Sequence, residues 1–345
     1  MQTTLWIRRL TQIAVVLACC VVALGAYTRL KDAGLGCPDW PGCYGQIGVP
    51  KTEEAIQAAN EAYPHRPVEA EKAWPEMVHR YFASSLGFLI LVISILAWRS
   101  RKTEGTSVKL PFILLALVIF QGILGMWTVT LGLFPTVVMG HLMGGFTTLS
   151  LLFLLAIIVS GKINPAPFAQ ANRMLSFTIA GMVILALQIA LGGWTAANYA
   201  AAVCAELPIC QAGWQEQINT SEAFRFWGHG LESKGLRDYE FGHHLSGSAK
   251  ITIHVAHRIG AIITTVYLGL LLGWMLLGNR PSWIKQIAAV ATVILAVQVG
   301  LGVSNIVFGL PLAVAVAHNG VAALLMLSLI WMSYSLYKAK GEQRG

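Results

Sequence analysis

Eight long apolar runs constrain this chain more than any other feature of its sequence. Each run holds roughly 17–25 mainly apolar residues, the length that an α-helix needs to cross a bilayer core of about 30 Å. Of the 345 residues, 56% are hydrophobic and 12% charged, which leaves too few polar side chains for a water-soluble surface. We therefore expect an all-α membrane protein with eight transmembrane helices. The runs lie near residues 11–30, 78–98, 110–131, 136–160, 174–197, 250–277, 283–305 and 311–337.

The distribution of Lys and Arg predicts the orientation of these helices. Arg8 and Arg9 precede the first run as in a secretion signal, but the run is long for a signal and no clear cleavage site ends it. We expect a retained helix, so that both termini share one compartment. The terminal side then carries a charge of about +11 and the opposite side about −3, which predicts cytoplasmic termini. The isoelectric point of 9.3 thus reflects membrane topology and not binding of nucleic acid.

Landmarks of the first half of the chain return in the second half in the same order. His79-Arg80 is followed 178 positions later by His257-Arg258, and the other landmarks return after 167 or 177 positions. Such repeats are typical of membrane proteins built from two related units. We expect two pseudo-symmetric four-helix bundles, formed by residues 1–165 and 166–345. The other matched landmarks are Gln121-Gly-Ile-Leu-Gly125 with Gln298-Val-Gly-Leu-Gly302, His141 with His318, and Cys37…Cys43 with Cys204…Cys210.

Four histidines occupy matched places near the outer ends of apolar runs, where ionisable groups are costly and usually functional. A single buried histidine could simply bond to a neighbour, but four at one depth favour paired metal ligands. Their neighbours are mainly Gly, Ala and Leu, which lack the further ligands that zinc or copper would need and would let a flat macrocycle approach the backbone. We therefore expect each bundle to hold a haem between two imidazoles near the outer face. The histidines are His79, His141, His257 and His318.

Four of the six cysteines form two short pairs in the outer loops, Cys37 with Cys43 and Cys204 with Cys210. Each pair encloses five residues in a compartment where disulfides persist, so we expect two disulfide bonds. Each bond could close a turn or act as a redox couple near a haem. The structural role is favoured for Cys204–Cys210, and both roles stay open for Cys37–Cys43.

The two halves differ one turn before the first ligand, where Glu76 matches His254. Positions i and i+3 share a helix face, so Glu76 should lie on the side of His79. There it could accept protons during an oxidation, or it could be a solvated acid near a helix start. Arg80 and Arg258 follow a ligand directly and are candidates to pair with haem propionates, or to extend to lipid headgroups.

Together these features resemble the haem A synthase family over nearly the whole chain. The resemblance implies successive hydroxylations that oxidise the C8 methyl of haem O to a formyl, giving haem A for aa3-type terminal oxidases. It implies a bacterial inner-membrane location, and it suggests a haem O synthase and terminal oxidase assembly factors as partners. It also implies resident haem b at His257 and His318, and substrate haem O at His79 and His141. The residues that carry it are Glu76-x-x-His79-Arg80, His141, His257-Arg258, His318 and the loop Gly34-Leu-Gly-Cys-Pro-Asp-Trp-Pro-Gly-Cys43.

Two other classes of protein would use the same four histidines. A di-haem b-type electron-transfer cytochrome would not need Glu76 to differ from His254. A haem-binding assembly factor would bind the macrocycle without altering it. The sequence leaves a homo-oligomer, the electron acceptor, the source of the inserted oxygen and the role of residues 214–248 open.

Overall fold

The computed structural model describes residues 2–102, 107–227 and 245–340, and these ranges are α-helical without any strand. Eight of their helices are long and apolar enough to cross a membrane. The expectation of an all-α protein with eight candidate spans is therefore confirmed. The spans are α1 (Gln2–Leu30), α3 (Ala70–Arg99), α4 (Lys109–Thr130), α5 (Pro135–Ser160), α6 (Ala171–Ala197), α8 (Gly247–Leu276), α9 (Ser282–Val307) and α10 (Leu312–Lys338).

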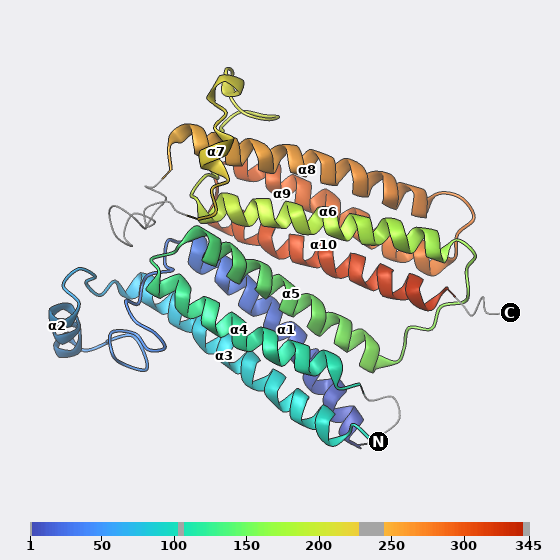
Figure 1. Ribbon diagram of the computed structural model, residues 1–345, viewed down its shortest axis with the longest axis horizontal. Coiled ribbons are helices and arrows are strands. Elements are labelled where there is room, and N and C mark those ends of the chain that lie inside the picture. Colours follow the sequence, from blue (N-terminus) through green and yellow to red (C-terminus); the bar gives the residue numbers. More distant parts are fainter. Residues whose placement is uncertain (1, 103–106, 228–244, 341–345) are drawn as a thin grey trace.

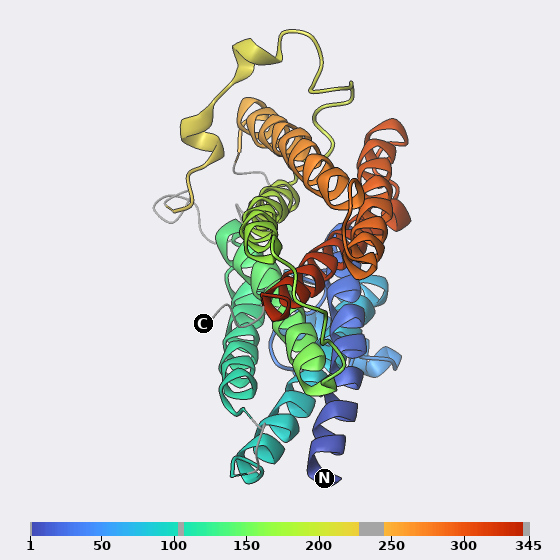
Figure 2. The same ribbon diagram turned by 90° about the vertical axis from the view of Figure 1, so that its right-hand side faces the viewer.

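The spans group by contact into two sets of four (Figures 1 and 2). Helices α1, α3, α4 and α5 pack on one another, as do α6, α8, α9 and α10, while α1, α5, α6 and α10 form the joint between the sets. Side chains such as Leu152 and Leu268 are fully buried, whereas Phe88 and Leu270 are largely exposed. Large apolar side chains on the outer surface suit contact with lipid, because lipid tails are as apolar as leucine.

Helices α3 and α8 begin before the apolar runs that predicted them. Helix α3 starts at Ala70 and accommodates Pro75 in its second turn. Helix α8 starts after Ser246, whose side chain accepts a hydrogen bond from the Ala249 amide at 3.2 Å, as is typical of a helix N-cap. The polar first turns carry both helices beyond the apolar segment and toward the outer loops.

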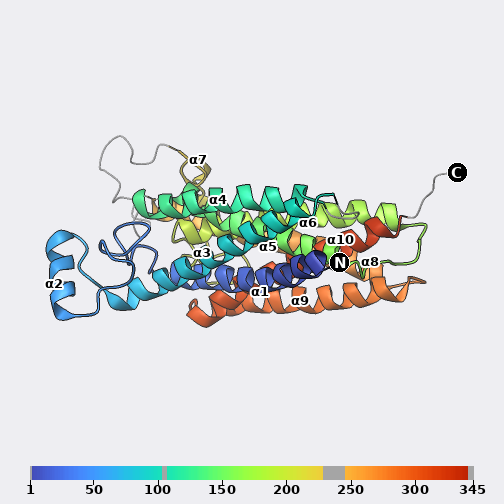
Figure 3. The same cartoon turned by 90° about the horizontal axis from the view of Figure 1, so that it is seen from below.

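The described parts of the two long loops contain three short helices: α2 (Glu53–Ala62), η1 (Trp214–Gln217) and α7 (Thr220–Ala223). Helices α2 and α7 lie at one end of the molecule, and α1 begins and α10 ends at the other (Figures 1 and 3). The two long loops therefore lie at the same end of the molecule. This is expected because four spans, α3 to α6, separate them along the chain.

Candidate functional site

The first pair of predicted ligands meets between two helices of the first set. His79 projects from α3 and His141 from α5, with ring centroids 6.4 Å apart and ring planes at 86°. Two nitrogens bound to one metal at about 2.0–2.1 Å would place the ring centroids about 6.2–6.5 Å apart. The distance between the two rings is therefore compatible with both imidazoles binding one metal ion.

The second predicted pair consists of His257 on α8 and His318 on α10. Within the described residues, no cluster of three or more His, Cys, Asp or Glu side chains could hold a metal ion. A structural zinc site needs about four such ligands. The described residues therefore contain no site of the structural zinc type.

Each of the four imidazoles lies against a glycine of a neighbouring helix that carries no predicted ligand. A Cβ atom added to any of these glycines would lie 3.0–3.3 Å from Cε1 of the histidine, closer than most side chains can approach. This contact was not predicted from the sequence, although Leu-Gly occurs at all four places. The contacts join Gly25 of α1 to His79, Gly125 of α4 to His141, Gly192 of α6 to His257, and Gly302 of α9 to His318.

Two glycines on the histidine helices receive glutamine side chains. A Cβ atom at Gly144 would lie 1.7 Å from Nε2 of Gln121, and one at Gly260 would lie 2.3 Å from Oε1 of Gln188. These glycines were expected to make room for a macrocycle. In the structure they make room for the two amides.

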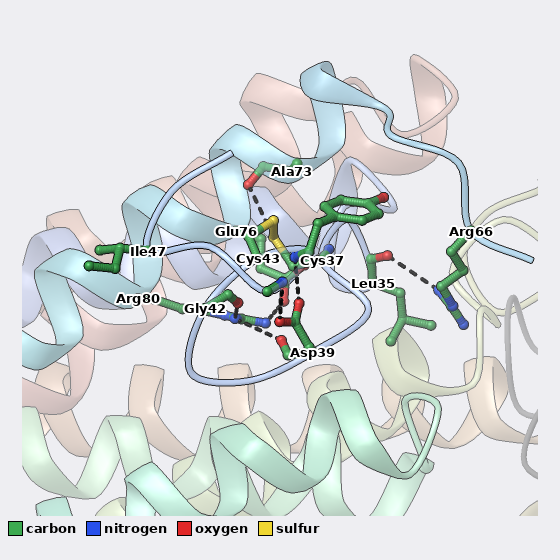
Figure 4. Close-up of a disulfide and its surroundings, with 12 residues drawn as sticks. Leu35, Cys37, Asp39, Gly42, Cys43, Ile47, Arg66, Ala73, Glu76 and Arg80 are labelled. Atoms are coloured by element: carbon green, nitrogen blue, oxygen red, sulfur yellow. Dashed lines mark hydrogen bonds and ion pairs between the residues drawn. A yellow bond between two sulfur atoms is a disulfide. The ribbon is translucent and has the colours of Figure 1, made fainter. Parts of the chain in front are cut away.

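Glu76 is buried and both of its oxygens have partners (Figure 4). Oε2 accepts a hydrogen bond from the Cys37 amide at 2.9 Å, and Oε1 pairs with Arg80 one turn later. The same arginine donates to the carbonyls of Asp39, Pro41 and Gly42 in the first outer loop. Glu76 and Arg80 thus attach the disulfide loop to the helix that carries His79.

The second half repeats this arrangement with a histidine in place of the carboxylate. Arg258 donates through Nε to Nε2 of His254 at 3.2 Å and through its other nitrogens to the carbonyls of Cys204, Glu206 and Ile209. All three guanidinium nitrogens therefore have partners within the protein. These contacts use four of the five N–H groups of the Arg258 guanidinium. The predicted pairing of Arg80 and Arg258 with propionates stays a prediction.

Both predicted disulfide bonds are formed, between Cys37 and Cys43 and between Cys204 and Cys210. Cys37 and Cys43 have no exposed surface. Next to this pair, burial and the charge of Glu69 raise the pKa of the Tyr44 hydroxyl, which donates to the Pro67 carbonyl at 3.1 Å. The two remaining cysteines, Cys19 and Cys20, are free.

The second outer loop reaches across to the first set of helices. The Phe226 carbonyl accepts a hydrogen bond from Thr136 in the first turn of α5 at 2.6 Å, and the Phe226 ring lies 4.9 Å from that of Trp194 on α6. Trp194 also donates to the Ala223 carbonyl at 2.8 Å. Part of the stretch 214–248 therefore lies over the joint between the sets, and residues 228–244 lie outside the described ranges.

The chain is similar to known proteins over nearly its whole length. The sequence profile of the COX15-CtaA family, described as cytochrome oxidase assembly protein, matches residues 8–330. A protein named Heme A synthase from Shewanella oneidensis is 44% identical over 98% of this chain and 97% of its own length. A protein of the same name from Rhizorhabdus wittichii is 27% identical over 94% of this chain and 92% of its own length. Another from Halalkalibacterium halodurans is 22% identical over 96% of this chain and 96% of its own length. The chain therefore belongs to the COX15-CtaA family of cytochrome oxidase assembly proteins.

Proposed function

We propose that this protein is a haem A synthase, which oxidises the C8 methyl of haem O to a formyl by successive hydroxylations. The single observation that carries the proposal is the facing pair His79 and His141, 6.4 Å apart, in a chain 44% identical to a protein of that name. Membership of the family alone would also suit an assembly factor without catalytic activity. A pair of imidazoles at this spacing favours a protein that would bind the macrocycle itself.

The residues of the chain fit a haem in each half. His79 and His141 would hold substrate haem O, and His257 and His318 would hold resident haem b. Four glycines let these imidazoles lie close to neighbouring helices, as a well-packed cofactor site between helices requires. The bound haem b supplies one-electron redox chemistry through its iron.

Glu76 is our candidate for the group that accepts protons at the substrate half. Its carboxylate lies one turn from His79 and is shielded from solvent, and a general base must lie close to the proton that it removes. Each of its oxygens already has a partner, Arg80 for Oε1 and the Cys37 amide for Oε2, and a carboxylate oxygen has a second lone pair that can accept a proton. The matching position in the second half is occupied by His254 and not by a carboxylate. This difference supports the different roles that we propose for the halves.

The disulfide bonds are proposed to close the outer loops over the two haem sites. Arg80 and Arg258 each bind carbonyl groups of one loop, so a closed loop holds its arginine beside the first ligand of each pair. The buried sulfur atoms of Cys37 and Cys43 favour the structural role over exchange with external thiols, because thiol–disulfide exchange requires access to a sulfur.

The charge asymmetry supports a bacterial inner-membrane protein with both termini in the cytoplasm. A haem O synthase and terminal oxidase assembly factors are the proposed partners, since a lipophilic substrate and product are best transferred directly between proteins. Assembly into a homo-oligomer is compatible with this arrangement.

Extraction of pigments from the purified protein tests the function. We expect haem b together with haem A or a hydroxymethyl intermediate when the protein is produced in cells that make haem O. Haem b alone in both halves would identify an electron-transfer cytochrome instead. Unaltered haem O beside haem b would indicate an assembly factor, and either result would overturn the proposed reaction.

A further inference from the structure

Two arginines lie over one tryptophan ring at the end of the second set of helices that is opposite the long loops. Cζ of Arg173, in the first turn of α6, lies 5.8 Å from the ring centroid of Trp274 near the end of α8. Cζ of Arg280 lies 5.4 Å from the same centroid. Arg280 belongs to the connection from α8 to α9, which lies at the other end of the molecule from α7 (Figure 1). We call Arg173, Trp274 and Arg280 the inner cluster.

The two positive charges of the inner cluster have no negative partner in the described part of the chain. The ion pairs there are made by other residues, and the segments 161–181 and 269–290 contain no Asp or Glu. Nε of Arg280 and Nε1 of Trp283, in the first turn of α9, are shielded from solvent and donate to no acceptor in the same ranges. Like charges repel, and a buried donor without an acceptor lowers stability. The inner cluster therefore suits an anion with several acceptor oxygens.

The surface beside the inner cluster is apolar. Phe177, one turn after Arg173, is 43% exposed, and Leu270 and Leu277 on the α8 side are 71% and 72% exposed. The Phe177 ring packs edge-on against Trp274 with 5.9 Å between the ring centroids. Aromatic side chains are enriched where a membrane helix meets water. The charges thus lie at the water-facing end of an apolar surface that suits acyl chains.

We propose that the inner cluster binds the phosphate of an anionic phospholipid, with its acyl chains along the exposed apolar residues of α6 and α8. A guanidinium can donate two parallel N–H groups to a phosphate, and basic pockets between membrane helices on the cytoplasmic side suit acidic lipid head groups. A soluble phosphate would not use the apolar surface, and a choline head group would bring a third positive charge. With both termini in the cytoplasm, the lipid belongs to the inner leaflet.

Titration of the full-length protein with phosphatidylglycerol tests the proposal. The protein is freed of lipid in detergent, and native mass spectrometry gives the dissociation constant of the first lipid that binds. We expect Arg173→Gln and Arg280→Gln each to weaken this binding about 5-fold, the usual contribution of one basic residue near an anionic lipid surface. Arg280→Lys keeps the charge and should retain more of the affinity than Arg280→Gln.

Arg101→Gln is the matched control. Arg101 also lies over a tryptophan, Trp98 at the end of α3, with 4.2 Å from its Cζ to the ring centroid. It has no second arginine over the same ring among the described residues, so we expect the affinity for phosphatidylglycerol to stay unchanged. Circular dichroism of each variant checks that its helices are intact.

Phosphatidylcholine and inorganic phosphate distinguish the possible ligands. We expect phosphatidylcholine to bind the wild-type protein more weakly than phosphatidylglycerol, and equally to all variants. Equal affinity of the wild-type protein and the Arg173→Gln, Arg280→Gln double variant for phosphatidylglycerol would overturn the proposal. So would displacement of the lipid by millimolar inorganic phosphate, which would identify a site for a soluble anion instead. The inner cluster lies at the opposite end from the four ligand histidines, so these outcomes do not depend on the proposed reaction.

Discussion

Glu76 and His254 occupy matching places and both contact the arginine one turn later. Helical spacing predicted the shared face of Glu76 and His79, because positions three apart are neighbours on a helix. It could not predict the hydrogen bond from the Cys37 amide, which joins residues far apart in sequence through the fold of a loop. The four histidine positions could be predicted because each is rare and costly in an apolar run, whereas glutamine and glycine beside them are common residues.

Replacement of Glu76 by glutamine removes the proposed proton acceptor together with the ion pair to Arg80. A glutamine oxygen can still accept the bond from the Cys37 amide, while the side chain can no longer take a proton from substrate. We expect haem to bind at His79 and His141, and formation of haem A to fall about 10²-fold or more. The measurement is the ratio of haem O, hydroxymethyl haem and haem A extracted from the variant.

His254→Gln is the matched control in the other half. It also changes the partner of the following arginine, Arg258, but it lies beside the haem that we propose to be resident. We expect it to reduce conversion far less than Glu76→Gln. Equal losses in the two variants would mean that both residues only hold their arginines and loops.

At the scale of elements, the spans were predictable because length and hydropathy are local properties of the chain. The short helices α2 and α7 were not predicted, since they lie in polar loops where tertiary contacts decide the conformation. The early starts of α3 and α8 were missed for a related reason. Their first turns are polar because they contact the outer loops and extend beyond the apolar segment.

The contact between α6 and α8 at Gly192 gives a test of helix spacing at a haem site. A Cβ atom at Gly192 would lie 3.1 Å from Cε1 of His257, so Gly192→Ala must displace the imidazole by a few tenths of an ångström. We expect a shifted b-type absorption spectrum and faster loss of haem, although alanine favours a helix by about 1 kcal/mol over glycine.

Gly269→Ala in α8 is the control, because nothing lies within 4 Å of its added Cβ. It should keep the spectrum and leave thermal stability unchanged or higher. If Gly192→Ala also kept the wild-type spectrum and haem release rate, close approach at Gly192 would not be needed to position His257.

At the scale of the whole molecule, repeated landmarks predicted two units, and the contacts among spans form two sets of four. The contacts between the two sets could not be predicted. The residues that make them are not repeated between the halves, and no sequence pattern distinguishes them from residues at other helix ends. Arg29 at the end of α1 is the main example. In the sequence it appears as one more basic residue at the outer end of a span.

Arg29 links the two sets of helices at their outer ends. Its guanidinium donates to the carbonyls of Ala196 and Ala197 at the end of α6, at 2.6 and 3.3 Å, and lies 3.9 Å from the ring centroid of Tyr199. The last carbonyls of a helix have no partner within the helix, and a cation there is favourable.

Arg29→Ala should therefore lower the free energy of unfolding by about 1.5–3 kcal/mol, the range for hydrogen bonds to charged groups. Titration of purified protein with a denaturing detergent, followed by circular dichroism, measures this change. Arg101→Ala, which removes an exposed contact with Trp98, should have almost no effect. Equal stability of the Arg29→Ala and wild-type proteins would mean that the contacts of Arg29 with the end of α6 do not contribute measurably to holding the two sets together.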